Sequence, residues 1–273
     1  MILGSGTPNY APSYAQQCSA VIVNDRPYLI DCGDGIMGRI VQARIEKEIG
    51  AFANEKLTRL FITHLHPDHT AGLAGLIVGP WVLDRQEPLH VYGPKGTQRL
   101  VSGILDAYED GIAEHRDGMA PVADSLRVVV HEIVAGEIYR DDNVTVEAFP
   151  VLHGGLEAYG LRFTSADKVI VHSGDTCPQR SIVEHAKGCD ILVHEVYMAG
   201  SLRFHSPSWQ RYHRTVHTSG IELAEMAREI RPKLLVLNHQ LVWGDKTEAD
   251  LIAEIAAIYD GPFVSGHDLD LFE

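Results

Sequence analysis

Three histidines and one aspartate crowd into six consecutive positions in the first third of the chain. The segment reads LFITHLHPDHTAG over residues 60–72, and the four side chains are those of His64, His66, Asp68 and His69. Imidazole and carboxylate groups are ligands that Zn²⁺ and related divalent ions prefer. Four such groups at this spacing predict a metal site, whereas a solvated histidine-rich turn is the alternative interpretation.

Pro67 indicates how these four side chains are presented. A proline disfavours the helical conformation at the residue before it and suits the first position of a helix. We therefore expect His64 and His66 on an extended loop, where alternate residues can point at one ion. Asp68 and His69 then lie in the first helical turn and point toward a neighbouring position, so the spacing suits two ions rather than one.

Other metal-type ligands stand where predicted strands end. Five apolar segments run directly into a histidine or an aspartate. These residues are His64, His153, Asp175, His194 and His239. Strands of one sheet end at the same edge, where loops begin. A rigid sheet therefore positions residues at these strand ends close to one another. The pattern predicts one site assembled from distant parts of the chain.

Short segments rich in Val, Ile and Leu predict strands throughout the chain. They cover residues 20–23, 28–31, 57–63, 89–93, 126–133, 144–153, 168–175, 190–195 and 233–239. Helical patterns with one apolar face lie between them, at residues 36–49 and 97–112. Because strands and helices interleave, and no linker or repeat separates them, we predict one layered α/β domain over residues 1–273.

Three further helices are predicted from their start signals. A hydroxyl residue followed three positions later by an acidic residue is typical of a capping box. The pairs are Ser181 with Glu184, Ser219 with Glu222 and, in a weaker form, Thr247 with Asp250. The last of these helices is expected to run to Tyr259.

Composition argues against a membrane protein and against a general nucleic-acid surface. The formal net charge is −14, whereas polyanion binding draws on clustered Lys and Arg. No apolar run approaches the roughly 20 residues that span a bilayer, and no signal peptide is visible. The four cysteines lack CxxC spacing and are typical of reduced thiols. We therefore expect a cytoplasmic protein, although removal of a leader would leave the same pattern.

The motifs resemble those of a known superfamily. HLHPDH at 64–69 is similar to the HxHxDH signature of the metallo-β-lactamase superfamily. Further motifs resemble the branch that contains ribonuclease Z, its short phosphodiesterase relatives and arylsulfatase-like hydrolases. They are GSGTP at 4–8, DCGDG at 31–35, YGPKG at 92–96, SGDT at 173–176, HEVY at 194–197 and HTS at 217–219. The resemblance covers essentially the whole chain and implies a four-layer αββα sandwich.

The resemblance also implies a binuclear centre. The first ion is expected on His64, His66 and His153, the second on Asp68, His69 and His239, with Asp175 bridging the two. We expect Zn²⁺, with Mn²⁺ or Fe as alternatives. Such a pair lowers the pKa of a shared water toward about 7 and gives a bridging hydroxide at neutral pH. Asp68 is expected to orient that hydroxide or to accept its proton.

Resemblance to the ribonuclease Z branch assigns a proton donor for the leaving group. His217 and Glu195 match the positions of a His–Glu pair that serves the leaving oxygen in that branch. A carboxylate beside an imidazole orients the ring and favours its protonated form. The alternative for His217 is a hydrogen bond at a helix start and nothing more.

The segment between Glu195 and Glu222 reverses the charge of the chain, because it contains no acidic residue. Arginines and aromatic residues alternate in it. The candidates for substrate binding are Arg211, Arg214, Tyr212 and Trp209. Such a segment suits an anionic substrate with an aromatic portion, whereas a surface loop whose arginines pair with acidic neighbours is the alternative.

One family feature is missing. Bacterial ribonuclease Z typically carries a long basic arm between the counterparts of His153 and Asp175, and here only a turn and two strands fit between them. The sequence therefore favours a phosphodiesterase for a small anionic ester, acting without nucleic acid or membrane, and we expect a homodimer. Alternatives are arylsulfatase-like, lactone, thioester or β-lactam hydrolysis; tRNA 3′-processing and a non-catalytic metal-dependent binding protein are less favoured.

Overall fold

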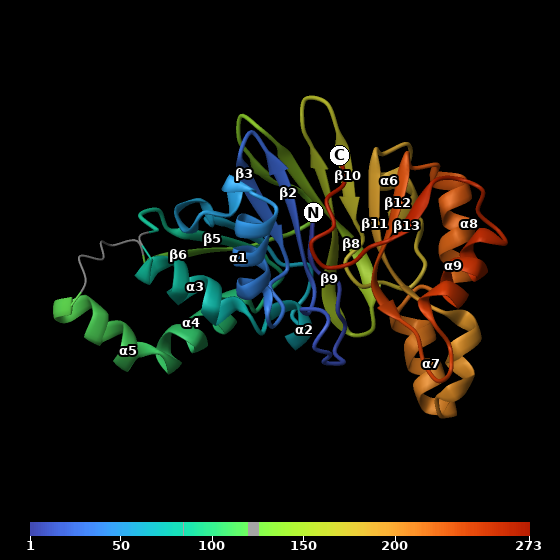
Figure 1. Cartoon of the computed structure of the whole chain (residues 1–273), viewed down its shortest axis with the longest axis horizontal. Helices are drawn as coiled ribbons and strands as arrows, with labels where there is room; N and C mark the ends of the chain where they lie inside the picture. Colours follow the sequence, from blue (N-terminus) through green and yellow to red (C-terminus); the bar gives the residue numbers. More distant parts are fainter. Residues whose placement is uncertain (84, 120–125) are drawn as a thin grey trace. The chain divides into compact units, whose positions relative to one another are not determined.

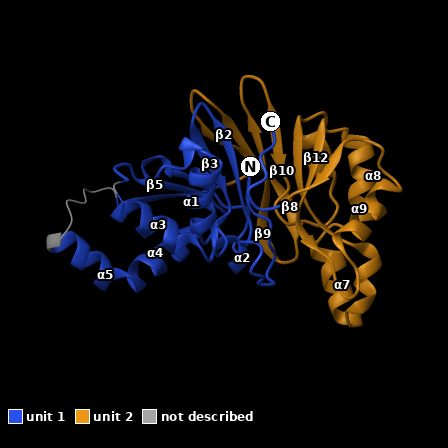
Figure 2. Ribbon diagram, viewed as in Figure 1, with its two compact units in different colours: residues 1–133, 267–273 blue, residues 134–266 orange. Residues whose placement is uncertain are grey.

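The computed structural model describes residues 1–83, 85–119 and 126–273. Within them the chain forms two compact units, which Figure 2 shows in two colours. Unit 1 contains residues 1–133 and 267–273, and unit 2 contains residues 134–266. Among the described residues no helix is both long enough and apolar enough to cross a membrane.

Unit 1 is built on a mixed sheet whose strands follow one another in space as they do in sequence. Its strands are β1 (Ile2–Gly4), β2 (Cys18–Val23), β3 (Arg26–Ile30), β4 (Arg59–Phe61), β5 (Leu89–Gly93) and β6 (Val128–Glu132). The first three are antiparallel, and β3 to β6 are parallel. The last residues of the chain lie beside β1, since Leu269 N donates to Ile2 O at 2.8 Å.

Parallel strands need crossover connections, and in unit 1 helices supply them. They are α1 (Ile36–Glu46), α2 (Pro67–Thr70), α3 (Leu73–Val82), α4 (Thr97–Ala107) and α5 (Glu109–Glu114). Short 3₁₀ turns occupy Gly50–Phe52 and Asn54–Lys56, and a π turn follows α5 at His115–Met119. The core forms where α1 and α3 pack on the sheet through Ile36, Ile40, Leu73, Leu76 and Ile77.

Unit 2 has a second mixed sheet, ordered β13-β12-β11-β10-β9-β8-β7. Its strands are β7 (Gly136–Arg140), β8 (Thr145–His153), β9 (Leu156–Thr164), β10 (Val169–His172), β11 (Ile191–Tyr197), β12 (Leu234–Leu241) and β13 (Phe263–Ser265). The strands from β7 to β10 are antiparallel, and those from β10 to β13 are parallel.

Helices of unit 2 connect and cover its parallel strands. They are α6 (Arg180–Ala186), α7 (Pro207–Val216), α8 (Gly220–Ile230) and α9 (Glu248–Ala256), with a 3₁₀ turn at Ala199–Phe204. Apolar residues of α6, α8 and α9 pack with the sheet in one core. Capping boxes confirm the predicted starts of α8 at Ser219 and of α9 at Thr247.

Three predicted helix features are wrong. Helix α6 begins one residue earlier than its expected cap, after Gln179, and the Ser181 hydroxyl donates to Pro150 O at 3.0 Å instead of capping a helix. The helix predicted over 97–112 is broken at Tyr108 into α4 and α5. Helix α9 ends at Ala256 rather than at Tyr259.

The strand predictions hold with small shifts of their ends, but three strands, β1, β7 and β13, were not predicted. Strand β9 was expected only as one of two strands between His153 and Asp175, without bounds. The predicted α/β class is confirmed by two mixed sheets, each with its own helices and core.

Candidate metal centre

The histidine-rich segment of unit 1 adopts the predicted loop and helix start. His64 and His66 follow β4 on a loop, and Pro67 is the first residue of α2. His64 Nε2 and His66 Nδ1 lie 3.0 Å apart. In the first turn of α2, Asp68 Oδ2 lies 3.6 Å from His69 Nε2. The segment therefore presents two pairs of ligand atoms, as its spacing predicted.

A buried carboxylate fixes the ring orientation in both pairs. His69 Nδ1 donates to Asp31 Oδ2 at 2.8 Å, so its Nε2 carries the lone pair. The Thr63 hydroxyl donates to the same carboxylate at 2.9 Å. Because that hydroxyl is already a donor, His64 Nδ1 donates to it at 3.1 Å and leaves Nε2 as the acceptor atom. Asp31 thus selects the tautomer that a metal ligand needs.

Asp31 and Thr63 had no role in the sequence interpretation. Asp31 opens the DCGDG motif and adopts a left-handed backbone conformation with φ 60°, which Asp tolerates better than most residues. Thr63 directly precedes His64. The signal that could have found them is an acidic residue at the end of the strand beside β4.

Close backbone contacts hold α2 against the DCGDG loop. Cys32 N donates to His69 O at 2.7 Å, and Gly72 N donates to Cys32 O at 2.9 Å. A Cβ on Gly33 would lie 2.3 Å from Asp68 O, and a Cβ on Gly72 would lie 2.2 Å from Gly33 O. Both positions therefore require glycine if the metal-type ligands of α2 are to keep their places.

This contact predicts a large difference between two similar substitutions. Gly72→Ala should lower the free energy of unfolding by about 2–4 kcal/mol, because backbone atoms must move to admit the methyl group. Gly79→Ala is the matched control, since nothing lies within 4 Å of a Cβ there and alanine favours a helix by about 1 kcal/mol over glycine. Denaturant unfolding of both variants checks this; equal stabilities would contradict the close-contact argument.

In unit 2 one carboxylate oxygen stands among three imidazoles. Asp175 Oδ2 lies 3.9 Å from His153 Nε2, 3.6 Å from His239 Nε2 and 3.9 Å from His217 Nδ1. Asp175 is buried, in the loop that follows β10. The structure thus brings together four of the predicted site residues within unit 2.

His239 owes its place to a β-bulge. On β12 the register slips between Asn238 and Gln240, so His239 has no partner residue on β11. Its φ is 46°, a left-handed value that is unusual for a residue with a side chain. Bulges redirect side chains next to functional sites. His239 was predicted at a strand end and instead lies within β12, because the bulge supplies the redirection that a strand end would have given.

Glu195 and His217 form the pair that the resemblance implied. Glu195 Oε2 lies 3.3 Å from His217 Nδ1. Its other oxygen accepts hydrogen bonds from Thr218 N at 2.9 Å and Thr176 N at 3.2 Å. Burial raises the pKa of Glu195 and nearby Asp175 adds to this, whereas His239 and the two backbone amides act the other way. The two backbone hydrogen bonds hold the Glu195 side chain in one orientation toward His217.

The two remaining strand histidines differ in role. His153 ends β8 as predicted, and its Nδ1 donates to Val216 O at 2.7 Å, which turns Nε2 toward Asp175. His194 lies within β11 rather than at its end, and Nδ1 donates to Glu195 O at 2.6 Å. Burial lowers the pKa of His194 to about 4, so it is a neutral imidazole at pH 7.

The donor atoms fit divalent ions. Two ligands bound at about 2.1 Å on a tetrahedral ion lie about 3.4 Å apart. The separations within the two clusters, 3.0 to 3.6 Å in unit 1 and 3.6 to 3.9 Å around Asp175, are close to that value. In three of the histidines the Nδ1 hydrogen is already donated elsewhere, which leaves Nε2 for an ion.

The predicted substrate-binding residues lie on α7. Trp209 and Tyr212 are 53% and 41% exposed, and their rings meet edge to face at 5.3 Å. Arg211 and Arg214 are exposed, on the side of the helix away from buried Val216. The aromatic pair and the two arginines are therefore solvent-accessible on different sides of α7.

The comparisons with known proteins identify the family of the chain. The family model described as "Beta-lactamase superfamily domain" matches residues 26–240. "Ribonuclease Z" of Mycobacterium sp. (strain KMS) is 32% identical over 280 residues, which cover 100% of this chain and 94% of the relative. "Ribonuclease Z" of Mycobacterium bovis (strain BCG / Pasteur 1173P2) is 30% identical, with 100% and 96% covered.

Solved structures share the fold. The metallo-β-lactamase fold protein YhfI from Bacillus subtilis matches with a TM-score of 0.73 at 17% identity, covering 100% of this chain and 98% of that one. The short form of human tRNase Z matches with the same TM-score and the same coverage of both chains, at 20% identity. A diphosphatase from the PhnP family gives 0.64 at 18% identity, covering 98% and 94%.

The chain belongs to the beta-lactamase superfamily domain family, and its fold is the metallo-β-lactamase fold. Within that superfamily it belongs to the ribonuclease Z branch, and it is a hydrolase. The histidine and aspartate clusters of the two units suit divalent metal ions.

Proposed function

We propose that the chain is a binuclear metal-dependent phosphodiesterase that acts, as one hydrolase domain, on a small anionic ester. The observation that supports this most is Asp175, whose Oδ2 lies within 3.9 Å of nitrogens of three histidines. A carboxylate in such surroundings suits a bridging ligand, because it offsets the charge of two cations at once.

His64, His66 and His153 would hold one ion, Asp68, His69 and His239 would hold the other, and Asp175 would be the ligand shared by both. Membership of the superfamily supports this assignment, because the matched residues 26–240 contain all seven candidate ligands. Two divalent ions would supply a nucleophile at neutral pH by lowering the pKa of water. Zn²⁺ suits the donors best, and Mn²⁺ and Fe are alternatives.

The chain's own residues supply the proton transfers of the proposed reaction. Asp68, buried at the start of α2, orients the attacking water and accepts its proton. His217 donates a proton to the leaving oxygen. Glu195 Oε2 lies 3.3 Å from His217 Nδ1 and, as a carboxylate, favours the protonated imidazole that this proton donation needs.

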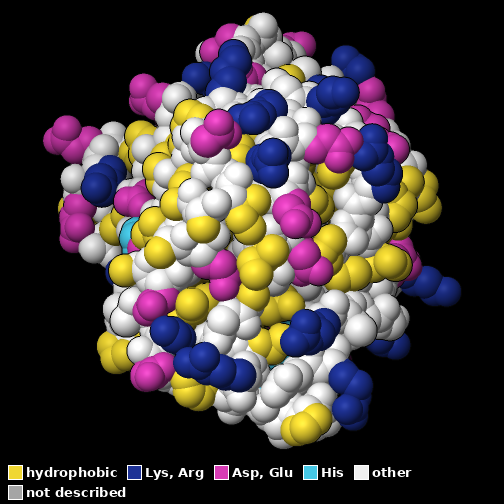
Figure 3. Space-filling model, turned by 90° about the vertical axis from the view of Figure 1, so that its right-hand side faces the viewer, with side chains coloured by type: hydrophobic (Ala, Val, Ile, Leu, Met, Phe, Trp, Pro, Cys, Tyr) yellow, Lys and Arg dark blue, Asp and Glu magenta, His cyan; other side chains and the backbone are white. Residues whose placement is uncertain are grey.

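A small substrate agrees with the charge of the protein. The net charge of −14 opposes a long polyanion. Figure 3 shows more Lys and Arg than acidic side chains toward the lower end of its face, and in Figure 1 α7 lies at that end. We propose that Arg211, Arg214, Tyr212 and Trp209 on α7 attract and contact the anionic substrate.

Processing of the 3′ end of tRNA is the second candidate. The relatives named ribonuclease Z favour it, and they also weaken one argument against it. The 280 aligned positions barely exceed the 273 residues of this chain, so the aligned part of the relative contains no long arm either. The missing arm therefore does not separate this chain from those relatives, and charge is the argument that remains.

A substrate panel separates the candidates. With Zn²⁺ or Mn²⁺, we expect the highest kcat/KM for bis-p-nitrophenyl phosphate, lower values for an aryl sulfate, a lactone, a thioester and a β-lactam, and little cleavage of a precursor tRNA. Replacing Arg211 and Arg214 together by Gln should raise KM for the phosphodiester and leave KM for the neutral lactone unchanged. Efficient cleavage of the tRNA at its 3′ side would overturn the small-substrate proposal.

Two further expectations belong to the same proposal. A homodimer is expected, and sedimentation equilibrium measures its mass. A cytoplasmic location is supported by four thiols that form no disulfide, since a reducing compartment favours that state.

A further inference from the structure

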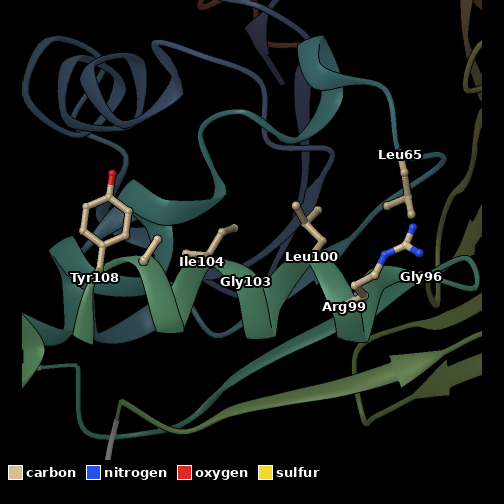
Figure 4. A pocket seen from close by; sticks show the side chains of 8 residues that line it. Leu65, Gly96, Arg99, Leu100, Gly103, Ile104 and Tyr108 are labelled. Carbon is tan, nitrogen blue, oxygen red and sulfur yellow. The ribbon is translucent and has the colours of Figure 1, made fainter.

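A groove of about 450 Å³ runs along α4 in unit 1. Figure 4 shows it with Leu100, Ile104 and Tyr108 on the same side of the helix. Leu65, which lies between His64 and His66, forms one end. The groove therefore begins at the loop that carries two of the metal-type ligands.

The sequence of α4 explains why the groove is apolar. Leu100, Ile104, Ala107 and Tyr108 recur at the spacing that gives a helix one apolar stripe. Such a stripe is normally covered by a neighbouring element, yet Leu100 and Ile104 are only half-buried and Tyr108 is 52% exposed. The helix thus leaves part of its apolar face open within unit 1.

One cation lines the groove. The guanidinium of Arg99 points toward Leu65 in Figure 4. Within the described part of the chain, no hydrogen bond or ion pair joins the Arg99 side chain to another residue. The Glu132 carboxylate is engaged at the start of α4, where its Oε1 accepts hydrogen bonds from Gly96 N and Gln98 N.

Gly96 keeps this end of the groove open. Its φ is 106°, which favours glycine, and a Cβ there would lie 3.1 Å from Leu65 Cδ1 and 3.9 Å from Arg99 Nη2. A side chain at this position would fill the space between the apolar wall and the cation. The geometry leaves that space available to a ligand.

We propose that the groove binds the aromatic half of an ester substrate, with an anionic group of that half paired to Arg99. Ligand sites of about 300–1,000 Å³ are typically apolar with a few polar groups that fix orientation, and this groove has that composition. A carboxylate, sulfonate or phosphate on an aryl ring matches both the wall and the charge. The identity of the ligand as substrate rests on the proposed hydrolase function; the groove as a binding site does not.

Binding of 2-naphthalenesulfonate tests the site without measuring activity. Ligand-observed NMR titration should be run on the purified protein and again after chelator treatment, so that an anion held by metal is recognised. Binding should persist after chelation. Arg99→Gln should weaken it about tenfold, the size expected for loss of a charged hydrogen bond, and should leave the binding of neutral 2-naphthalenemethanol unchanged.

A second variant pair tests the groove itself. Nothing lies within 4 Å of a Cβ on Gly103, so Gly103→Trp should fold and fill the groove, abolishing binding of both probes. Ser102→Trp adds the same bulk at an exposed neighbouring position of α4 and should leave binding unchanged. Equal binding by wild type and Gly103→Trp overturns the inference, and so does loss of binding after chelation alone.

Two further outcomes distinguish a ligand site from a subunit interface and from a failure of the proposed function. Sedimentation velocity of wild type and Gly103→Trp detects a second copy of the chain as occupant: if Gly103→Trp halves the mass while naphthalenesulfonate binds neither protein, the groove is a subunit interface and the inference is overturned. If the probes bind as predicted but no ester is hydrolysed, the proposed function fails and the groove stands as a ligand site.

Discussion

Replacing Asp175 by Asn should reduce kcat/KM for bis-p-nitrophenyl phosphate by about 10³-fold or more. The variant keeps the shape of the side chain but removes the charge that stands within 3.9 Å of three imidazoles. If that charge bridges two cations, its loss forfeits several kcal/mol of stabilisation, and each 1.36 kcal/mol is a factor of ten in rate. Metal content should fall from two ions per chain to one or none.

Asp190→Asn is the matched control for this experiment. Asp190 is another carboxylate of unit 2, but it accepts a hydrogen bond from Val169 N at 2.7 Å and pairs with Lys233, away from the histidines. This variant should keep both its metal and its activity. A similar loss of activity in the two variants would show that the effect of Asp175→Asn is general destabilisation and would remove the bridging role.

His217→Ala should separate substrates by their leaving groups. We expect a loss of about 10²–10⁴-fold for alkyl phosphodiesters, the usual contribution of a general acid. Activated aryl esters should lose only a few-fold, because their leaving oxygen departs without a proton. The ratio of the two rates, measured in one preparation, is the diagnostic quantity.

Three companions make the His217 experiment decisive. Metal content should stay at the wild-type value, since His217 is the proton donor and not a ligand in the proposed sets. Glu195→Gln should shift the leaving-group ratio in the same direction but less far. It keeps the His217 imidazole and removes only the negative charge of Glu195 Oε2, which lies 3.3 Å from His217 Nδ1. His185→Ala, a change on partly exposed α6, should alter neither rate. Equal losses on both classes of ester would contradict the proton-donor role.

The sequence predicted the local structure around the candidate ligands better than the long-range contacts that position them. Residue types and the spacing around Pro67 were enough to predict the loop and helix start that present His64, His66, Asp68 and His69, and both are confirmed. The position of His239 was not predictable in the same way. A bulge with φ 46° depends on the pairing of β11 with β12, which no local pattern records.

Supporting residues were missed for a related reason. Asp31 acts through Thr63 and His69, which follow it by 32 and 38 positions in the chain. Hydrogen bonds of that sequence separation arise only when parallel strands β3 and β4 pair. The acidic residue at a strand end marks Asp31 as a possible site residue, but the sequence alone does not show which side chains it contacts.

Among the strands, β9 illustrates how packing can hide a pattern. Gly160 weakens its strand signal, since glycine in a strand interior usually disfavours one. In the structure Gly160 pairs with Phe149 on β8, and a Cβ there would lie 2.4 Å from the Phe149 ring. The Phe149 ring covers Gly160 across the strand pair, so only glycine fits at this position. The same glycine is the residue that weakens the strand pattern of β9 in the sequence.

Metal analysis of the purified chain tests the central claim most directly. After reconstitution with excess Zn²⁺ and removal of loosely bound metal, elemental analysis against protein concentration should give two ions per chain for wild type, and one or none for Asp175→Asn. A wild-type value near zero, or two ions in both proteins, would contradict a binuclear centre bridged by Asp175.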